Sequence, residues 1–136
     1  MASRACLHLR SIIPLVSLLF LSACGVYIET QMLNGVAPHA KICPEAVRVF
    51  GTPNQVGAEY QEIAQLSVDT RRFKDWAPGP EQVVEAQRRK AASLGANGLV
   101  FRNSGGGYER YPAALAIYVA QESTNVAALC ATRSRA

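Results

Sequence analysis

The cysteine at position 24 has the sequence context of a lipid attachment site. It ends the stretch Leu21-Ser22-Ala23-Cys24, which closes an apolar run and precedes Gly25. This is the pattern of a bacterial lipobox, in which a signal peptidase cuts before a cysteine whose sulfur carries diacylglycerol. The small residues at 22 and 23 suit the peptidase pocket. We therefore predict lipidation of Cys24. The alternative is an ordinary secretory cut nearby, with Cys24 as an unmodified thiol.

Residues 1–23 have the character of a signal peptide. They contain Arg4 and Arg10 and no acidic residue, followed by an apolar run over 12–21 that Pro14 interrupts. A membrane-spanning helix needs about 20 apolar residues, and this run is roughly half as long. We expect the segment to be removed, so that the protein is held by lipid and not by a helix.

Lipidation of Cys24 would decide where the protein works. Each buried methylene contributes about 0.8 kcal/mol, so two or three acyl chains hold a protein on a membrane almost permanently. Bacterial lipoproteins of this type resemble one another in carrying diacylglycerol and usually an N-acyl chain such as palmitate. Gly25 follows the cysteine, in place of the aspartate that retains many such proteins in the inner membrane of enteric bacteria. We expect the periplasmic face of the outer membrane, with the inner membrane as the alternative.

Two further cysteines remain in the predicted mature chain, Cys43 and Cys130, because Cys6 leaves with the signal. Disulfides persist in the periplasm. A bond between the two would close a loop of about 90 residues and stabilise the fold by at most roughly 4 to 5 kcal/mol. The alternative is two separate thiols. A metal site would need more ligands than these, since His39 is the only histidine of the predicted mature chain and zinc sites usually have four ligands.

Catalytic motifs are not recognisable in the sequence. It has no Gly-X-Ser-X-Gly elbow, no His-Glu-X-X-His and no P-loop. A Ser-His or Cys-His pair would require His39 to fold back from a linker onto the domain. The glycine-rich stretch 104–107 lacks the lysine and the helix that follow a phosphate-binding loop. We predict that the protein is not an enzyme and needs no cofactor.

The overall charge argues against nucleic acid as a partner. The formal net charge of +4 falls by two, to +2, when Arg4 and Arg10 leave with the signal. A nucleic-acid binder normally has a clustered, strongly basic face. The basic residues of the later chain are a candidate patch for anionic lipid or cell-wall polymer, or else a solvated face: Arg71, Arg72, Lys74, Arg88, Arg89 and Lys90.

Phe73 and Trp76 are the candidates for contact with a protein partner. They lie in a charged loop over 69–80, and a large aromatic side chain in such a loop can anchor an interface. The alternative is that Trp76 covers the start of the following helix and closes the core.

These candidate residues must be positioned by a small domain. Residues 24–44 mix glycine, proline and polar residues without a sustained period, which predicts a lipidated cysteine and a tether. Residues 45–136 are expected to form one domain. Apolar alternation or short apolar runs predict strands over 46–50, 60–68, 99–101, 114–120 and 126–131, with a bulge at Glu62 and Ile63.

One helix is expected over 80–94. Pro80 suits its first turn, acidic residues lie near its start, basic residues lie near its end, and Gly95 follows. Its buried stripe is expected at Val84, Ala91 and Leu94, interrupted by Gln87. The order of elements predicts an α+β fold, with a small mixed or antiparallel sheet of four to five strands and one helix packed across it.

The phrase over 91–101, Ala-Ala-Ser-Leu-Gly-Ala-Asn-Gly-Leu-Val-Phe, preceded by the strand with Tyr60-Gln61-Glu62-Ile63-Ala64, carries a family resemblance. It resembles the core of small bacterial lipoproteins related to the stress sensor RcsF, and the wider YbjQ-like group that is labelled heavy-metal-binding. The small residues let the helix sit close to the sheet, and Gly95 and Asn97-Gly98 are expected to provide positive φ at a sharp exit. RcsF-like domains have two disulfides, whereas this chain has cysteines for one.

The sequence therefore predicts a non-catalytic binding or stress-sensing lipoprotein of the cell envelope, joined to the membrane by its lipid and to an envelope protein partner. The alternative is a structural or assembly component of an envelope complex. A weaker alternative is metal binding through Cys43 and Cys130.

Overall fold

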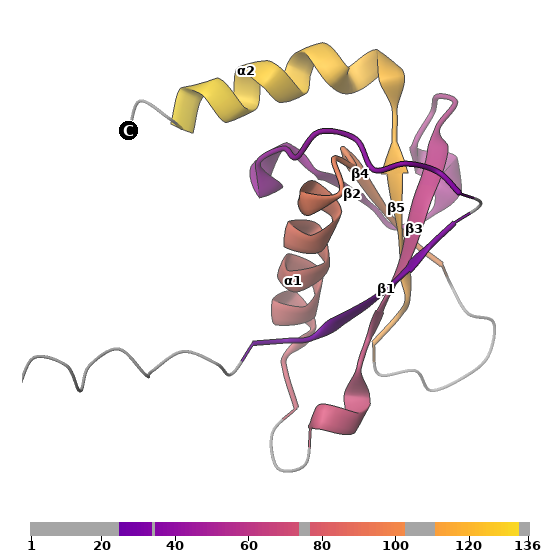
Figure 1. Ribbon diagram of the computed structural model, residues 1–136, viewed down its shortest axis with the longest axis vertical. Coiled ribbons are helices and arrows are strands. Elements are labelled where there is room, and N and C mark those ends of the chain that lie inside the picture. The colour runs from indigo at the N-terminus through magenta and orange to yellow at the C-terminus, as the bar shows by residue number, and fades with distance from the viewer. Residues whose placement is uncertain (1–24, 34, 74–76, 103–110, 134–136) are drawn as a thin grey trace, which may run out of the picture.

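A mixed sheet with one helix against its face is the centre of the structure (Figure 1). The computed structural model describes residues 25–33, 35–73, 77–102 and 111–133. Within these ranges the strands are β1 (Ile28–Met32), β2 (Arg48–Phe50), β3 (Gln61–Val68), β4 (Gly98–Phe101) and β5 (Ala114–Tyr118). The α-helices are α1 (Pro80–Ser93) and α2 (Ser123–Arg133), and short 3-10 turns are η1 (Pro44–Ala46), η2 (Pro53–Gln55), η3 (Thr70–Arg72) and η4 (Ala120–Glu122).

The strands are ordered β1-β3-β5-β4-β2 across the sheet. All neighbouring pairs are antiparallel except β2 and β4, which are parallel. The register of β3 against β5 shifts between Glu62 and Ala64, so the predicted bulge is confirmed. The bulge explains why the consecutive residues Ile63 and Ala64 are both fully buried. The predicted α+β class with a mixed sheet is confirmed.

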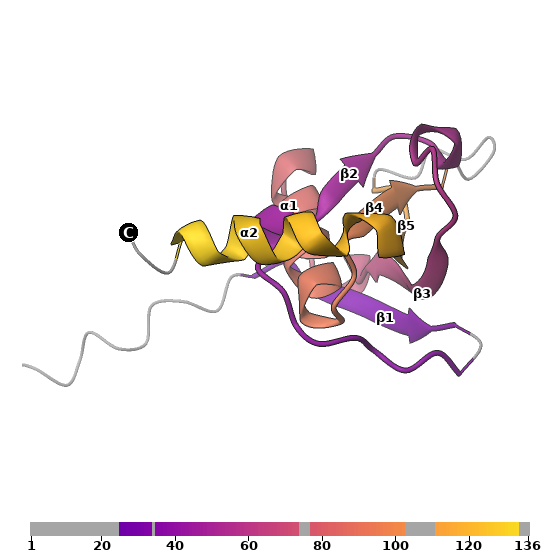
Figure 2. The same ribbon diagram turned by 90° about the horizontal axis from the view of Figure 1, so that it is seen from above.

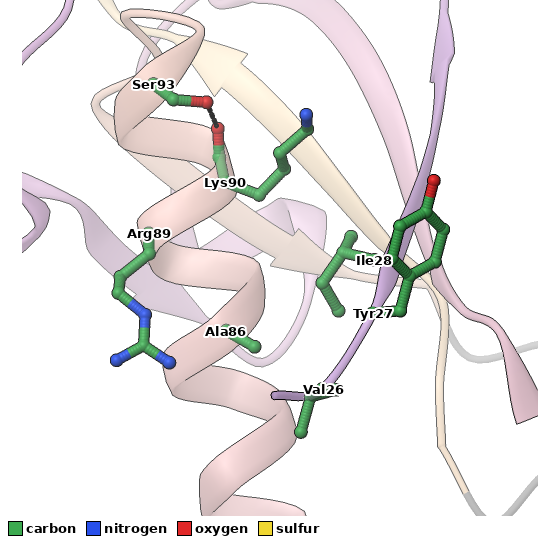
Figure 3. A pocket seen from close by; sticks show the side chains of 7 residues that line it. All are labelled: Val26, Tyr27, Ile28, Ala86, Arg89, Lys90 and Ser93. Atoms are coloured by element: carbon green, nitrogen blue, oxygen red, sulfur yellow. Dashed lines mark hydrogen bonds between the residues drawn. The ribbon is translucent and has the colours of Figure 1, made fainter. Parts of the chain in front are cut away.

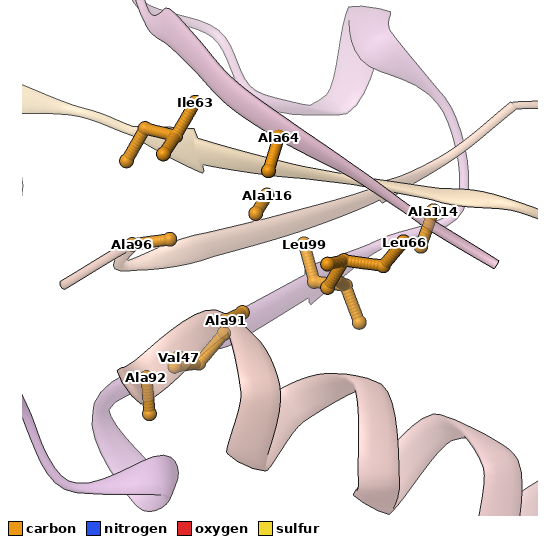
Figure 4. Packing of buried hydrophobic residues seen from close by; sticks show 10 residues of the cluster. All are labelled: Val47, Ile63, Ala64, Leu66, Ala91, Ala92, Ala96, Leu99, Ala114 and Ala116. Carbon is orange, nitrogen blue, oxygen red and sulfur yellow. The ribbon is translucent and has the colours of Figure 1, made fainter. Parts of the chain in front are cut away.

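Both faces of the sheet are buried, and alternate residues serve different faces. One cluster packs between the sheet and α1 and includes Ala64, Ala114 and Ala116, whose small side chains let α1 approach closely (Figure 4). The other cluster includes Val100, Leu115 and Ile117 and is covered by the chain between β2 and β3. Successive residues of β4 and β5 therefore pack in different layers, one on each face of the sheet.

The start and end of α1 follow from local chemistry. Pro80 occupies its first turn, and the Gln82 Oε1 accepts a hydrogen bond from the Gly79 amide at 3.0 Å. At the other end, Gly95 has a φ of +73°, and the Ala96 amide reaches back to the Ala91 carbonyl at 3.0 Å. This is the Schellman arrangement, which needs a left-handed residue and favours glycine.

The buried face of α1 differs from the predicted stripe. Val84 and Leu94 are only partly buried, whereas the buried positions are Val83, Ala86, Gln87, Ala91 and Ala92. Gln87 was expected to interrupt the stripe, yet it is fully buried, and its Nε2 donates to the Pro112 carbonyl at 3.2 Å. Its Oε1 has no hydrogen-bond partner among the described residues, so one half of the amide is paired and the other is not. Apolar periodicity alone does not reveal that a polar side chain occupies the core face.

Asn97 joins the end of α1 to the end of β5. Its side chain is 2% exposed; Nδ2 donates to the Val119 carbonyl at 2.8 Å, and Oδ1 accepts from the Val119 amide at 2.7 Å. Gly98 does not have the predicted positive φ; instead, a Cβ there would lie 2.6 Å from Ile117 Cγ1. The Asn-Gly pair is thus explained by one buried hydrogen-bonding side chain and one close approach.

We expect Asn97→Ala to lower the free energy of unfolding by about 2 to 4 kcal/mol, because two buried backbone groups of Val119 would lose their partners. Urea denaturation measures this. The exposed Asn54, replaced by alanine, is the matched control and should change stability by less than about 0.5 kcal/mol. Equal effects of the two substitutions would contradict the role assigned to Asn97.

The predicted tether over 24–44 is wrong for much of its length. Ile28–Met32 is an edge strand that pairs antiparallel with β3, in register from Ile28 opposite Val68 to Met32 opposite Ala64. Further on, the His39 and Ile42 amides donate to the Leu94 and Ala92 carbonyls at the end of α1. The last carbonyls of a helix lack the usual partners, and the passing backbone supplies a donor to Leu94 and a further donor to Ala92, whose carbonyl also accepts from the Gly95 amide.

The predicted strand over 126–131 is also wrong, because this segment belongs to α2. A short apolar run does not distinguish a strand from a helix, and this one is rich in alanine, the strongest helix former. Figures 1 and 2 show α2 running across the end of the molecule where α1 finishes, with its last turns extending beyond the other elements.

Candidate functional site

Cys24, the predicted lipidation site, lies outside the described residues. The neighbouring Gly25 is exposed, and β1 starts at Ile28, four residues after the cysteine. An extended chain covers about 3.5 Å per residue, so the covalent path from Cys24 to the sheet is at most about 14 Å. A lipid on Cys24 would therefore hold the domain directly at the membrane surface.

Cys43 and Cys130 form a disulfide in the structure, with Cα atoms 5.6 Å apart. Cys43 immediately precedes η1, and Cys130 lies in α2. The Cys43 amide also donates a hydrogen bond to the Cys130 sulfur at 3.1 Å. The bond thus fastens α2 to the part of the chain that packs against the end of α1.

The main contacts of α2 are with η1 and η4, so it lies on the end of the domain and not on a face of the sheet. A groove of about 380 Å³ runs between it and the body. Arg48 of β2 and Glu122 of η4 form an ion pair there, and Leu129 on the helix is 52% exposed. The residues that line the groove are Ala46, Arg48, Glu122, Asn125, Val126, Ala128 and Leu129. Sequence analysis missed this surface because it assigned the segment to a strand.

Of the two aromatic residues predicted to contact a partner, Phe73 lies within the described residues and Trp76 does not. Phe73 is half-buried, with its ring edge-on to Tyr111 at a centroid distance of 6.2 Å. The Tyr111 hydroxyl in turn donates to the Pro78 carbonyl at 2.6 Å, just before α1. Phe73 therefore takes part in packing near the start of α1. Trp76 and Lys74 lie outside the described residues, as does the glycine-rich stretch 104–107.

Asp69 holds two arginines at the end of β3. Its Oδ1 accepts from the Arg71 Nε at 2.9 Å, and its Oδ2 accepts from the Arg72 Nε at 3.4 Å. The hydrogen bond from Arg71 is the main reason that the pKa of Asp69 lies below its ordinary value, and the same pair raises the pKa of Arg71. The Arg72 guanidinium lies 4.1 Å from the centre of the Tyr27 ring. The amide of Asp69 also donates to the Tyr27 carbonyl, so η3 is tied to the chain that precedes β1.

A second groove, of about 360 Å³, lies between α1 and the start of β1. Figure 3 shows its lining: Val26, Tyr27 and Ile28 from the β1 side, and Ala86, Arg89, Lys90 and Ser93 from α1. In this view the Lys90 side chain extends from the helix towards the β1 side, while Arg89 leaves the helix on the other side. Within the part of the chain that the structure describes, neither cation forms an ion pair with a carboxylate.

His39 folds back onto the domain, contrary to its expected place in a tether. Its ring stacks on Tyr118 at a centroid distance of 3.9 Å, and its Nε2 lies 3.4 Å from the Gln61 Oε1. His39 and Ser123 both line a third groove, of about 240 Å³, but no hydrogen bond joins them among the described residues. The described residues also contain no cluster of three or more His, Cys, Asp or Glu side chains that would hold a metal ion.

None of the helices in the described ranges is long and apolar enough to cross a membrane. The chain matches no known protein family and no curated protein. The resemblance to RcsF-like and YbjQ-like lipoproteins therefore stays a prediction. Among solved structures, the chain is similar to a Francisella virulence factor, FvfA, with 16% sequence identity over 69% of this chain and 96% of that one, and a TM-score of 0.40. At this level of similarity nothing about the function of FvfA transfers to the present chain.

Proposed function

We propose that this protein is an envelope lipoprotein, anchored through Cys24 on the periplasmic face of the outer membrane, that acts as a non-catalytic binding or stress-sensing module. The lipobox at 21–24 supports the anchoring, and the disulfide between Cys43 and Cys130 is compatible with an oxidising compartment. The surface for the protein partner is α2 with its groove.

The observation that carries this proposal is that α2 is covalently fixed while much of its surface stays accessible. Between Ser123 and Ala131, all side chains except Val126 and Cys130 are exposed. A helix of 11 residues has little stability of its own in water, and this one packs only on the end of the domain. The disulfide keeps it in place without covering it. A helix that is ordered in advance costs less conformational entropy when a partner binds.

The groove gives this surface its chemistry. Val126, Ala128 and Leu129 contribute apolar side chains, and the Arg48–Glu122 ion pair lies at the same groove. An apolar strip with a polar rim is the usual composition of a protein interface. We infer that the partner is an envelope protein that contributes an apolar segment to this groove.

The two alternative functions differ in how this surface is occupied. A structural or assembly component would keep one partner permanently, whereas a sensor would change partner with the state of the envelope. Metal binding through Cys43 and Cys130 is not supported, because sulfurs bonded to each other are not thiolate ligands.

Photo-crosslinking in intact cells tests the proposed surface. A crosslinking amino acid in place of Ala128, which lines the groove, is expected to capture an envelope protein. The control is the same amino acid in place of the exposed Ala77, which precedes α1 in the loop over 69–80, called here the Phe73 loop. One stoichiometric adduct under all conditions favours assembly, and adducts that change under envelope stress favour sensing. Adducts from position 77 alone would move the interface to the Phe73 loop, and adducts from neither would overturn the proposal.

A further inference from the structure

We propose that the groove between α1 and β1 is the membrane-facing surface of the domain and that Lys90 and Arg89 bind the phosphate of anionic phospholipid headgroups there. This inference rests on the proposed anchoring of Cys24 and adds to it an orientation and a ligand class.

The groove is close to the proposed lipid attachment site along the chain. Val26 and Tyr27 line it, and Val26 is two residues after Cys24. Two residues of extended chain cover about 7 Å. A diacylglycerol on Cys24 enters the bilayer at the depth of the headgroups, so its attachment point and the groove are separated by less than the Debye length of about 8 Å at physiological salt. The edge of the groove at Val26 therefore lies within the electrostatic range of the lipid headgroups.

The charge of the groove suits an anionic surface. Lys90 and Arg89 line it, and among the described residues neither of them is paired with a carboxylate. Their neighbour Arg88 differs, since its Nη1 lies 3.9 Å from the Glu85 carboxylate. The groove therefore presents two positive side chains whose charge is not neutralised within the described fold. Basic side chains close to a membrane surface are attracted to anionic lipid.

The β1 side adds an aromatic ring of the kind that prefers a membrane interface. Tyr27 is 48% exposed, and its ring carries the Arg72 guanidinium on one face. Arg72 and Arg71 both form ion pairs with the carboxylate of Asp69, and Glu29 lies close enough to act on the charge of Arg71, so this corner has two cations and two carboxylates. Tyrosine is enriched at membrane–water interfaces because its ring is apolar and its hydroxyl is polar. Of the two cations of α1, Lys90 is the one that extends towards the β1 side, where Tyr27 lies (Figure 3).

Amine labelling of the full lipidated protein in nanodiscs tests the inference. The chain has lysines at positions 41, 74 and 90, and Lys41 is exposed and outside the groove. Acetylation of each lysine is followed by mass spectrometry in discs of phosphatidylcholine alone and in discs that contain one-third phosphatidylglycerol. We expect Lys90 to react about fivefold more slowly in the anionic discs, and high salt to remove the difference. Lys41 should react at the same rate in both.

A charge reversal and its matched control locate the effect. Arg89→Glu should abolish the difference that Lys90 shows between the two kinds of disc, whereas Lys41→Glu, the same reversal outside the groove, should leave it intact. Equal Lys90 rates in both kinds of disc, or equal slowing of Lys41, would overturn the inference. If inorganic phosphate added to phosphatidylcholine discs slows Lys90 as much as phosphatidylglycerol does, the groove is a site for free anions and the assignment to lipid is wrong.

The mass of the purified protein separates this inference from the proposed function. If the mature chain lacks the mass of the lipid, the anchoring itself fails. If the lipid is present and Lys90 is unprotected, only the orientation fails.

Discussion

Replacement of Cys24 by alanine is expected to abolish incorporation of a fatty-acid analogue completely and to leave the precursor uncut. The reason is chemical: the thioether to diacylglycerol forms on this sulfur, and the lipobox is cut only after that bond has formed. Metabolic labelling followed by gel electrophoresis measures both effects. The chain offers a matched control in Cys6, a cysteine within the predicted signal, since Cys6→Ala should leave labelling and cleavage unchanged. Labelling that persists in Cys24→Ala would show that the lipobox assignment is wrong.

The second large effect is expected from removal of the disulfide. Cys43→Ala with Cys130→Ala should lower the free energy of unfolding by about 2 to 5 kcal/mol, the range typical of small secreted domains. The bonded residues are 87 positions apart, so the unfolded chain loses much freedom when they are joined. The full entropic value is an upper limit, because α2 packs on the end of the domain and can detach when the bond is absent. Guanidinium denaturation of the oxidised protein and of the variant measures the difference.

Two further measurements separate the global from the local effect of that bond. Each single substitution should lower stability by about as much as the double substitution, because either one removes the same interaction. Limited proteolysis should cut α2 in the variants and spare β3 and α1, whose contacts do not involve the disulfide. Titration that finds two free thiols in the purified, oxidised protein would contradict the disulfide and return metal binding to consideration.

The position of β1 changes how the proposed anchoring would work. The sequence suggested a spacer of about twenty residues between the lipid and the domain, which would have allowed the domain to reach well into the periplasm. In the structure, residues 25–27 alone separate Cys24 from the strand. A partner of α2 would then have to come close to the membrane, while the groove beside Val26 would lie against it.

Several elements could be predicted because their signals are local. α1 carries its proline at the start, its charge order and Gly95 at the end within one stretch of chain, and the bulge in β3 is visible as a break in the alternation at Glu62 and Ile63. β1 has no such signal. In its sequence, Ile-Glu-Thr-Gln-Met, one face is polar throughout and the other is interrupted by the threonine. The segment becomes a strand because β3, more than thirty residues later, has an open edge with which it pairs.

The surfaces proposed for function depended even more on tertiary contacts. The segment 126–131 is a helix on the end of the domain, and nothing in its own sequence says what it packs against. Likewise, Lys90 and Val26 are far apart in sequence and line one groove only because β1 lies beside α1 (Figure 3).

By itself the sequence determined the predicted attachment at Cys24, the fold class and the two cysteines available for pairing. These depend on short motifs, on local periodicity and on composition, which act through neighbouring residues. The tertiary structure alone decided that the supposed tether is part of the sheet, that Cys43 is close enough to bond Cys130, and that α2 and the α1–β1 groove are surfaces. The physical reason is that pairing of a polar edge strand and docking of a short helix are stabilised by distant partners, and their free energy is not encoded in the segments themselves.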